Sequence, residues 1–154
     1  MKIELRKIKD EFYRDNSSLK EILHKEPNKE RGYGYIYVPI KGYNFAIPLR
    51  SHITHDNGFV LTTPPNSRGY GGLDYSKAII VSADYLGDVF VIDNKQFGKI
   101  YRNSKTIITE FTQYVENYIA YRTNDQLDST LKDAYYRAYR YSTMINYHEE
   151  LGIR

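Results

Sequence analysis

The sequence has 154 residues and a formal net charge of +3 at pH 7, from 22 Lys and Arg against 19 Asp and Glu. This length predicts one domain, over residues 1–154. The absence of Cys excludes disulfides and thiolate metal sites. No apolar run approaches the ~20 residues that span a bilayer. The charged N-terminus lacks the apolar core of a signal peptide, so we expect a cytoplasmic protein. So small a charge does not by itself indicate a nucleic-acid partner.

Tyrosine is the unusual component of the composition, with 17 Tyr and no Trp. A tyrosine ring stacks on nucleobases and its hydroxyl forms hydrogen bonds, so tyrosines beside Lys and Arg are typical of RNA-binding surfaces. The alternative is that Tyr replaces Phe at half-buried positions. Both interpretations stay open for any single tyrosine.

The N-terminal region predicts short elements. Residues 2–8 alternate apolar and charged side chains, which indicates an opening strand at an edge of the sheet. Residues 10–14 predict one helical turn. Ser18 and Glu21 have the spacing of a capping box, which predicts a helix before a charged loop at 26–32.

A hairpin follows. Residues 33–40 alternate apolar and tyrosine side chains, Lys41-Gly42 predicts a turn, and residues 43–49 return as an apolar strand. Antiparallel pairing then places residues 31–35 beside residues 50–52 at one end of the hairpin.

The remaining elements are read from apolar runs and helical periodicity. Residues 56–72 are the longest irregular stretch, with a short strand at 58–61. Further apolar runs predict strands at 77–83 and 89–92. Helices are predicted over 94–101, 104–122 and about 126–147. Because strands precede helices, the fold class is α+β, with a twisted, mostly antiparallel sheet flanked by helices.

Polar residues cluster directly after the apolar strand at 43–49. Arg50, Ser51 and His52 follow it, and His55 lies three residues further on. A cation, a hydroxyl and two imidazoles at the end of a strand suit holding a phosphate and moving a proton beside it. The alternative is a helix N-terminus capped by Ser51.

A second polar block, GLDYSK at residues 72–77, precedes an apolar strand, and sites are commonly built at such sheet edges. Lys77 is its candidate for binding a phosphate. The alternative is a turn in which Asp74 or Ser76 bonds to the local backbone.

Residues 34–55 (GYIYVPIKGYNFAIPLRSHITH) and 72–81 (GLDYSKAIIV) resemble the toxin component of type III toxin–antitoxin systems. That group includes ToxN, AbiQ, CptN and TenpN, and the TenpN branch is the nearest. The likeness covers about residues 1–120. It rests on a strand–turn–strand element leading to Pro-Leu-x-Ser, here residues 48–51, and on the second block after a variable loop. Arg50 stands where other branches have Thr, and Ile53 where some have Lys.

The resemblance implies a fold related to ToxN and to MazF/Kid toxins. It implies a metal-independent, sequence-preferring endoribonuclease without a cofactor. The implied partners are RNA substrates and a repetitive, pseudoknot-like antitoxin RNA, which forms a hetero-oligomer with the toxin. The implied role is phage defence by abortive infection, or plasmid maintenance. Ser51 matches the essential serine of the family motif, and Arg31 falls where a basic residue precedes the first strand.

Metal-free RNA cleavage proceeds by attack of the 2′-hydroxyl on the adjacent phosphate, which leaves 2′,3′-cyclic phosphate and 5′-hydroxyl ends. It requires in-line positioning, charge stabilisation and proton transfer. We assign the phosphate to Arg31, Arg50 and Lys77. Ser51 is expected to donate a hydrogen bond, and His52 to transfer protons with His55 as its orienting partner or substitute. The residues expected to bind RNA are Tyr33, Tyr35, Tyr37, Lys41, Asp74, Tyr75, Ser76, Arg137 and Arg140.

Two other classes of function fit the same residues. In one, the chain is a non-catalytic RNA-binding regulatory module. In the other, the tyrosine-rich C-terminal helix is a protein interface. A metal-dependent nuclease is disfavoured because the carboxylates Asp56, Asp74 and Asp84 follow no metal-ligand spacing.

Overall fold

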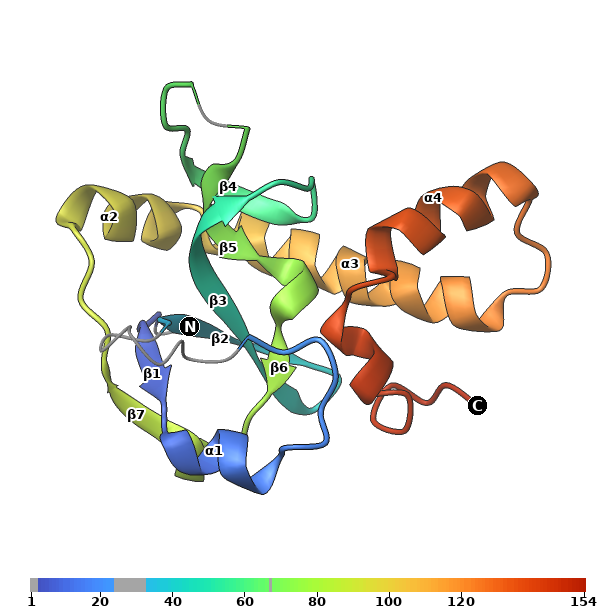
Figure 1. The fold of residues 1–154 in the computed structure, drawn as a ribbon, viewed down its shortest axis with the longest axis horizontal. Helices are drawn as coiled ribbons and strands as arrows, with labels where there is room; N and C mark the ends of the chain where they lie inside the picture. Colours follow the sequence, from blue (N-terminus) through green and yellow to red (C-terminus); the bar gives the residue numbers. More distant parts are fainter. Residues whose placement is uncertain (1–2, 24–32, 67) are drawn as a thin grey trace.

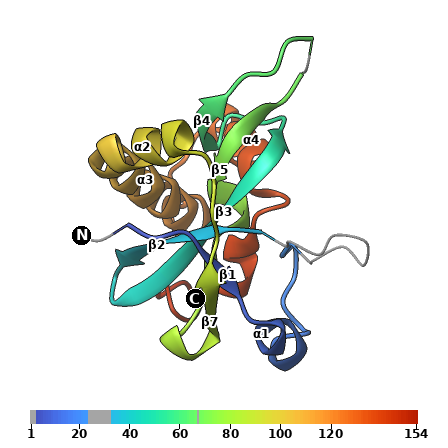
Figure 2. The ribbon, with the colours of Figure 1, turned by 90° about the vertical axis from the view of Figure 1, so that its left-hand side faces the viewer.

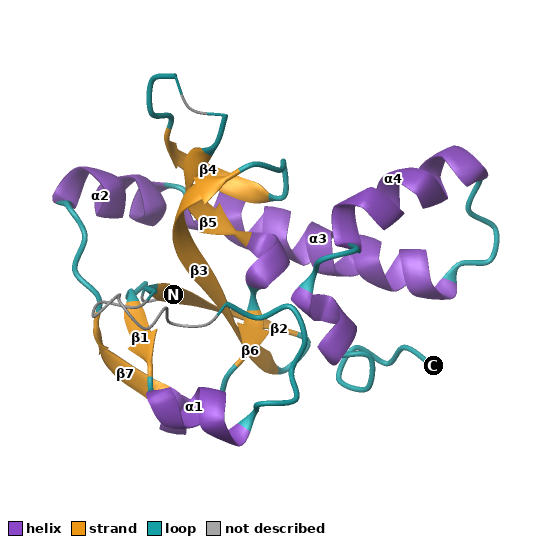
Figure 3. Ribbon diagram, in the orientation of Figure 1, coloured by secondary structure: helices purple, strands orange, loops and turns teal. Residues whose placement is uncertain are grey.

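The computed structural model describes residues 3–23, 33–66 and 68–154. Within them the chain forms one seven-stranded antiparallel sheet flanked by helices, which confirms the expected α+β class (Figure 3). The strand order is β4-β5-β3-β2-β1-β7, and β6 also pairs with β3. The strands are β1 (Arg6–Ile8), β2 (Tyr35–Ile40), β3 (Tyr43–Ile53), β4 (Gly58–Thr62), β5 (Tyr70–Asp74), β6 (Ile79–Ile80) and β7 (Leu86–Val89).

Four α-helices and three short 3-10 turns are found in the described residues. The helices are α1 (Asp10–Asp15), α2 (Asn94–Arg102), α3 (Ser104–Thr123) and α4 (Ser129–Tyr139). The 3-10 turns are η1 (Tyr75–Lys77), η2 (Ala83–Tyr85) and η3 (Thr143–Asn146). Helices α2 and α3 lie on one side of the sheet and α1 on the other (Figure 2). Along the longest axis, α2 and α4 lie at opposite ends (Figure 1). No helix in the described part of the chain is long and apolar enough to cross a membrane.

The predicted hairpin is confirmed. Its register runs from Tyr35 opposite Pro48 to Ile40 opposite Tyr43. The turn at Lys41-Gly42 has φ angles of 53° and 84°, the left-handed values that suit a two-residue hairpin. Strand β3 then crosses the core, where residues 45–48 are buried.

Strand β3 is longer than predicted. Its backbone stays paired with β5, with Leu49 opposite Leu73, Arg50 opposite Gly72 and Ile53 opposite Tyr70. The expected strand end before Arg50 is therefore wrong. The pairing partner comes from 20 or so residues further along the chain, a distance at which local patterning carries no information.

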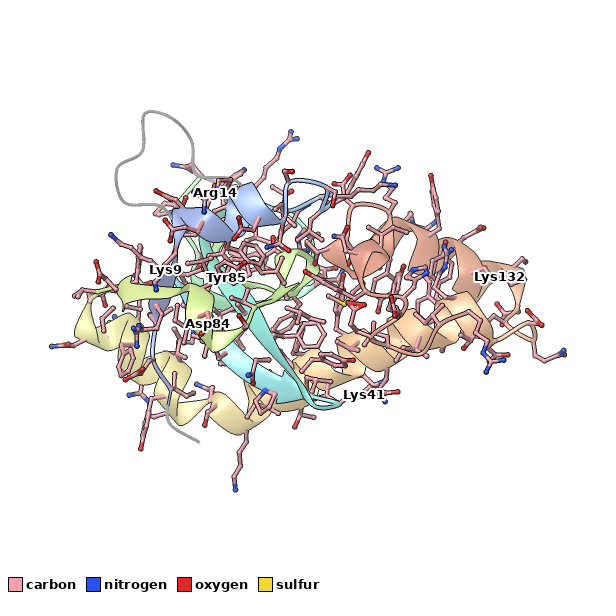
Figure 4. All side chains as sticks on the ribbon, turned by 90° about the horizontal axis from the view of Figure 1, so that it is seen from below. Lys9, Arg14, Lys41, Asp84, Tyr85 and Lys132 are labelled. Atoms are coloured by element: carbon pink, nitrogen blue, oxygen red, sulfur yellow. The ribbon has the colours of Figure 1, made fainter. Side chains whose placement is uncertain are left out.

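The N-terminal predictions are partly corrected. The helical turn is confirmed as α1. Strand β1 lies between β2 and β7, so it is not an edge strand. Its end is held to η2, where the Lys9 ammonium donates to the Asp84 carbonyl at 3.1 Å, close to Tyr85 (Figure 4).

No helix begins at Ser18. Residues 16–18 form a turn, and Glu21 has a φ of +64°, which no helix interior allows. The Asn146 amide accepts from the Lys20 N–H and donates to the Lys20 carbonyl, both at 2.8 Å. This distant side chain satisfies the backbone groups that a helix would have used. The predicted loop at 26–32 lies outside the described residues.

The boundaries of several later elements differ from the predicted ones. Helices α2 and α3 and strand β4 are confirmed. The strand predicted at 77–83 shrinks to β6, and the strand predicted at 89–92 is replaced by β7, which ends at Val89. The predicted helix over 126–147 is too long, because α4 ends at Tyr139. The Ser142 side chain then caps η3, and the Thr143 hydroxyl bonds to the carbonyls of Ser76 and Ala78.

Gly72 is required for the pairing of β4 with β5. A Cβ at this position would lie 1.9 Å from the carbonyl oxygen of Phe59. We expect Gly72→Ala to lower the free energy of unfolding by about 2 kcal/mol or more, because two backbones must part. Urea unfolding measures this. The control is Gly98→Ala in α2, whose Cβ would meet the flexible end of Arg102 and which should gain up to ~1 kcal/mol. Equal midpoints for wild type and Gly72→Ala would contradict the prediction.

Candidate functional site

A cleft of about 370 Å³ opens where β3 leaves β2 and pairs with β5; we call it the Arg50 cleft. Its walls come from β3, the β4–β5 hairpin, the segment after β7 and the start of α2. The lining residues are Tyr33, Leu49, Arg50, Ser51, Thr62, Pro64, Gly71, Gly72, Phe90, Ile92 and Gln96. The predicted hairpin thus brings Tyr33 beside Arg50 and Ser51, as expected from antiparallel pairing.

The Arg50 side chain is held in place by the carboxylate of Asp74. Its Nη1 donates to Asp74 Oδ2 at 2.7 Å, and the Asp74 side chain is fully buried while that of Arg50 stays 28% exposed. A charge-assisted bond of this length between neighbouring strands restrains the guanidinium. Because Arg50 also lines the cleft, its remaining N–H groups are available to an anion there.

Asp74 is held in turn by two further residues. The Ser76 hydroxyl donates to Asp74 Oδ1 at 2.6 Å and the Ser76 N–H at 3.0 Å, while His55 Nε2 lies 3.2 Å from the same oxygen. Burial alone would raise the pKa of the Asp74 carboxyl. The hydrogen bonds from His55 and Ser76, with the Arg50 contact, outweigh burial and lower that pKa below its ordinary value. Asp74 therefore stays ionised and keeps Arg50 in place.

This lowered pKa predicts acid sensitivity. A carboxyl whose folded pKa lies below its unfolded value of ~3.9 stabilises the fold above that value, and this contribution is lost as pH falls through the folded pKa. We expect Asp74→Asn to be less stable than wild type at about pH 7 by ~1–3 kcal/mol. The difference should shrink below about pH 4. Urea unfolding across this range measures both. A difference that stays constant with pH would contradict the assignment.

His55 contacts the residues that hold Arg50 in place. Its Nδ1 accepts from the Asn57 N–H at 3.0 Å, so Nε2 carries the proton in the neutral ring. Nε2 in turn faces Asp74 and the Ser76 hydroxyl, each at 3.2 Å. Both ring nitrogens are thus engaged, and His55 does not line the Arg50 cleft. His55 thus contacts Asp74, whereas the sequence predicted that it orients His52 or replaces it in proton transfer.

His52 is separated from the cleft. It is exposed, and its ring packs so closely on Gly69 that a Cβ there would lie 2.5 Å from Nδ1. It does not line the Arg50 cleft, whereas its neighbour Ser51 does. The pairing of β3 with β5 is irregular between Arg50 and Ile53, so side chains in this stretch do not follow simple strand alternation. The predicted cluster therefore divides into Arg50 and Ser51 in the cleft and His52 at its side.

Lys77 is engaged elsewhere, which corrects its predicted role at the phosphate. Its ammonium donates to the carbonyls of Glu21 at 2.8 Å and Tyr141 at 2.9 Å, and lies 3.5 Å from the Glu21 carboxylate. Burial lowers its pKa, and Glu21 acts in the opposite direction. Lys77 joins two surface segments and does not line the cleft.

The tyrosines of β2 also differ from expectation. Tyr35 is 1% exposed and its hydroxyl lies 3.2 Å from that of Tyr13, so it presents no ring face to a base. Tyr37 is half-buried in a separate hollow. Lys41 sits at the far end of the hairpin beside α3, 3.0 Å from Glu116 (Figure 4). Of this predicted group, Tyr33 lines the Arg50 cleft.

The second polar block is buried, so its residues do not form the RNA-facing surface that the sequence predicted. Tyr75 is 3% exposed and donates to Glu110 at 2.8 Å, and Ser76 is 6% exposed. The alternative of a local turn is correct here, because the Ser76 N–H donates to the Asp74 carboxylate. Arg137 and Arg140 are exposed on and just after α4. Arg31 lies outside the described residues.

Sequence reasoning missed two contributors. Gln96 reaches the cleft from α2, where its amide donates to Asp93 at 2.8 Å. Asn57 sets the tautomer of His55 through its backbone N–H. Neither carries a local signal, since each matters only through a residue brought close by the fold. Among the described residues, no group of three or more His, Asp or Glu is arranged to hold a metal ion.

Comparison with known proteins supports the fold. No protein-family model matches the sequence, and no curated protein matches it. One solved structure matches with a TM-score of 0.62 and 13% identity, over 100% of both chains. It comes from work on bacterial type III toxin–antitoxin systems that describes selective toxin inhibition by a non-coding RNA pseudoknot. At this identity the match establishes a common fold, the one expected from the sequence resemblance.

Proposed function

We propose that this protein is a metal-independent endoribonuclease toxin of a type III toxin–antitoxin system, with the TenpN branch its nearest kin. The observation that carries the proposal is the Arg50 cleft. A guanidinium restrained by a buried carboxylate stands beside Ser51, at the position of the family's serine motif, on a fold shared with a toxin of such a system.

The cleft suits an RNA phosphate. Arg50 offers a planar set of N–H donors to the non-bridging oxygens, whose charge grows as the 2′-hydroxyl attacks. Ser51 donates a further hydrogen bond and positions the 2′-hydroxyl. The ribose supplies the nucleophile, so Ser51 forms no covalent bond. We assign proton transfer to His52, since both nitrogens of His55 are occupied. The exposed His52 ring packs on Gly69, so this role requires it to turn toward the phosphate when RNA binds.

Partners follow from the same proposal. The substrates are cellular or phage RNA, and the inhibitor is a repetitive antitoxin RNA with a pseudoknot-like fold, bound in a hetero-oligomer. In this setting the enzyme acts in abortive phage defence or plasmid maintenance. We propose that Tyr33, which lines the cleft, stacks on a base, and that Arg31 contacts the phosphate.

The first test is cleavage of a mixed RNA in EDTA, with identification of the product ends. We expect 2′,3′-cyclic phosphate and 5′-hydroxyl ends from the wild type. The Ser51→Ala variant should cut ~10²–10³-fold more slowly, as when one transition-state hydrogen-bond donor is removed. Ser82→Ala, an exposed serine in the loop before η2, is the control for preparation and folding. Cleavage that requires added metal would refute metal independence.

One observation favours the alternative, a non-catalytic RNA-binding module. Neither His52 nor His55 lines the Arg50 cleft, so among the described residues no imidazole faces the proposed phosphate. If RNA is bound with a steep salt dependence and stays intact, the binding module is the correct function. Arg50 and Ser51 then bind phosphate without cleaving the RNA.

A further inference from the structure

A second hollow shares no lining residue with the Arg50 cleft. It has a volume of about 340 Å³ and is formed by α3, α4, the residues after α4 and the segment following α1. We call it the Tyr136 groove. Its walls include Lys20, Arg122, Tyr136 and Arg140. The cleft involves α2 and the groove involves α4, and these helices stand at opposite ends of the long axis (Figure 1).

The groove is basic. Lys20, Arg122 and Arg140 contribute positive charge, and Glu21 is the carboxylate among the described lining residues. That carboxylate lies 3.5 Å from the ammonium of Lys77, so its charge is offset locally. Arg122 and Arg140 are exposed, so their guanidinium groups remain hydrated and accessible. A ligand for this groove therefore carries negative charge.

The groove is also aromatic. Tyr136 is 55% exposed at its wall. Tyr121 and Tyr139 also line the groove and stack on each other, with ring centroids 6.1 Å apart and planes 16° apart. Arg122 lies 5.8 Å from the centre of the Tyr121 ring, so cationic and aromatic groups alternate over one surface. Flat rings interleaved with guanidinium groups match a chain in which flat bases alternate with phosphates.

We propose that the Tyr136 groove binds a single-stranded RNA segment, with a base stacked on Tyr136 and phosphates at Arg122 and Arg140. The choice of RNA as the nucleic acid rests on the proposed function. The groove is independent of the Arg50 cleft, and it gives the protein a second point of attachment for one RNA. An RNA held at both sites is bound more tightly than at either site alone.

The test uses the full chain carrying Ser51→Ala, so that RNA is not consumed. Binding of a fluorescein-labelled oligouridine is measured by anisotropy at several salt concentrations. We expect Tyr136→Ala and Arg140→Ala each to weaken binding by about tenfold or more. Arg140→Ala should also lower the salt slope by ~1. Both side chains are exposed, and matched thermal melts establish that the variants are folded.

Two controls match the chemistry of these changes outside the groove. Lys132→Ala removes an exposed charge from the same helix, and Tyr101→Ala removes a tyrosine that is 62% exposed on α2. We expect both to bind within about twofold of the parent. Equal losses of RNA affinity in Lys132→Ala and Arg140→Ala would mean that the effect comes from net charge alone. That result would overturn the proposal. Unchanged RNA binding together with altered self-association, seen by light scattering, would assign the groove to a protein partner instead.

Different results would refute the groove proposal and the ribonuclease proposal. If the wild type cuts no RNA but the groove variants still bind the oligouridine more weakly, the groove stands and the catalytic proposal falls. If the wild type cuts RNA and the groove variants bind like the parent, the groove proposal falls alone.

Discussion

The Arg50→Ala variant is expected to cleave RNA ~10²–10³-fold more slowly than wild type, as when one preorganised donor to the transition state is removed. Arg50 meets the requirement for preorganisation because its Nη1 is already fixed to the buried Asp74 at 2.7 Å. The Arg50 guanidinium therefore needs no rearrangement as charge develops on the phosphate. Single-turnover rates with saturating protein separate this effect from weaker RNA binding.

The stability of the same variant is a second readout. Removing Arg50 leaves Asp74 with Ser76 and His55, so we expect a loss of about 1–3 kcal/mol in the free energy of unfolding. Arg50→Lys keeps the charge but loses the planar set of donors, and should cut RNA at an intermediate rate. Arg14→Ala is the control, since Arg14 is an exposed arginine on α1. Wild-type cleavage by folded Arg50→Ala would remove Arg50 from the mechanism.

His52→Ala and His55→Ala are expected to lose different properties, cleavage activity in the first and stability in the second. His52 is exposed beside Ser51, so His52→Ala should lose ~10²–10⁴-fold in cleavage rate with an unchanged urea midpoint. His55 bonds to Asn57 and faces Asp74, so His55→Ala should lose ~1–3 kcal/mol of stability. Its cleavage should fall only as far as Arg50 loses its orientation.

The pH–rate profile separates the two histidines further. Loss of a group that transfers a proton changes the shape of the profile, whereas loss of a positioning residue scales the whole profile down. We expect the first behaviour from His52→Ala and the second from His55→Ala. If His52→Ala keeps the wild-type rate and profile, proton transfer belongs to a group other than His52. If His55→Ala keeps wild-type stability, the contacts of its ring contribute nothing to the fold.

Elements whose causes are local were predictable from the sequence. The β2–β3 hairpin follows from period-2 alternation around Lys41-Gly42, and both turn residues adopt the left-handed angles that such a turn requires. Helices α2 and α3 follow from apolar residues at helical spacing. The α+β class follows from their order along the chain. The hairpin alone also sufficed to bring Tyr33 beside Arg50 and Ser51.

Features that depend on distant partners were decided by the tertiary structure. The extension of β3 needs β5, and the failure of the helix at Ser18 needs the amide of Asn146. The end of α4 depends on Thr143, whose hydroxyl bonds to two carbonyls near η1. In each case a backbone group is satisfied by a residue far along the chain, and such a contact overrides local preference.

The candidate site shows the same division. Sequence alone determined that Arg50 and Ser51 stand together at the end of the hairpin. Only the fold decided that Asp74, 24 residues away, is the buried anchor of Arg50, and that His55 supports this anchor. It also directed Lys77 toward Glu21 and away from the cleft. Residue types reveal which chemistry is available, but charge pairing and burial depend on distances between strands that no local pattern encodes.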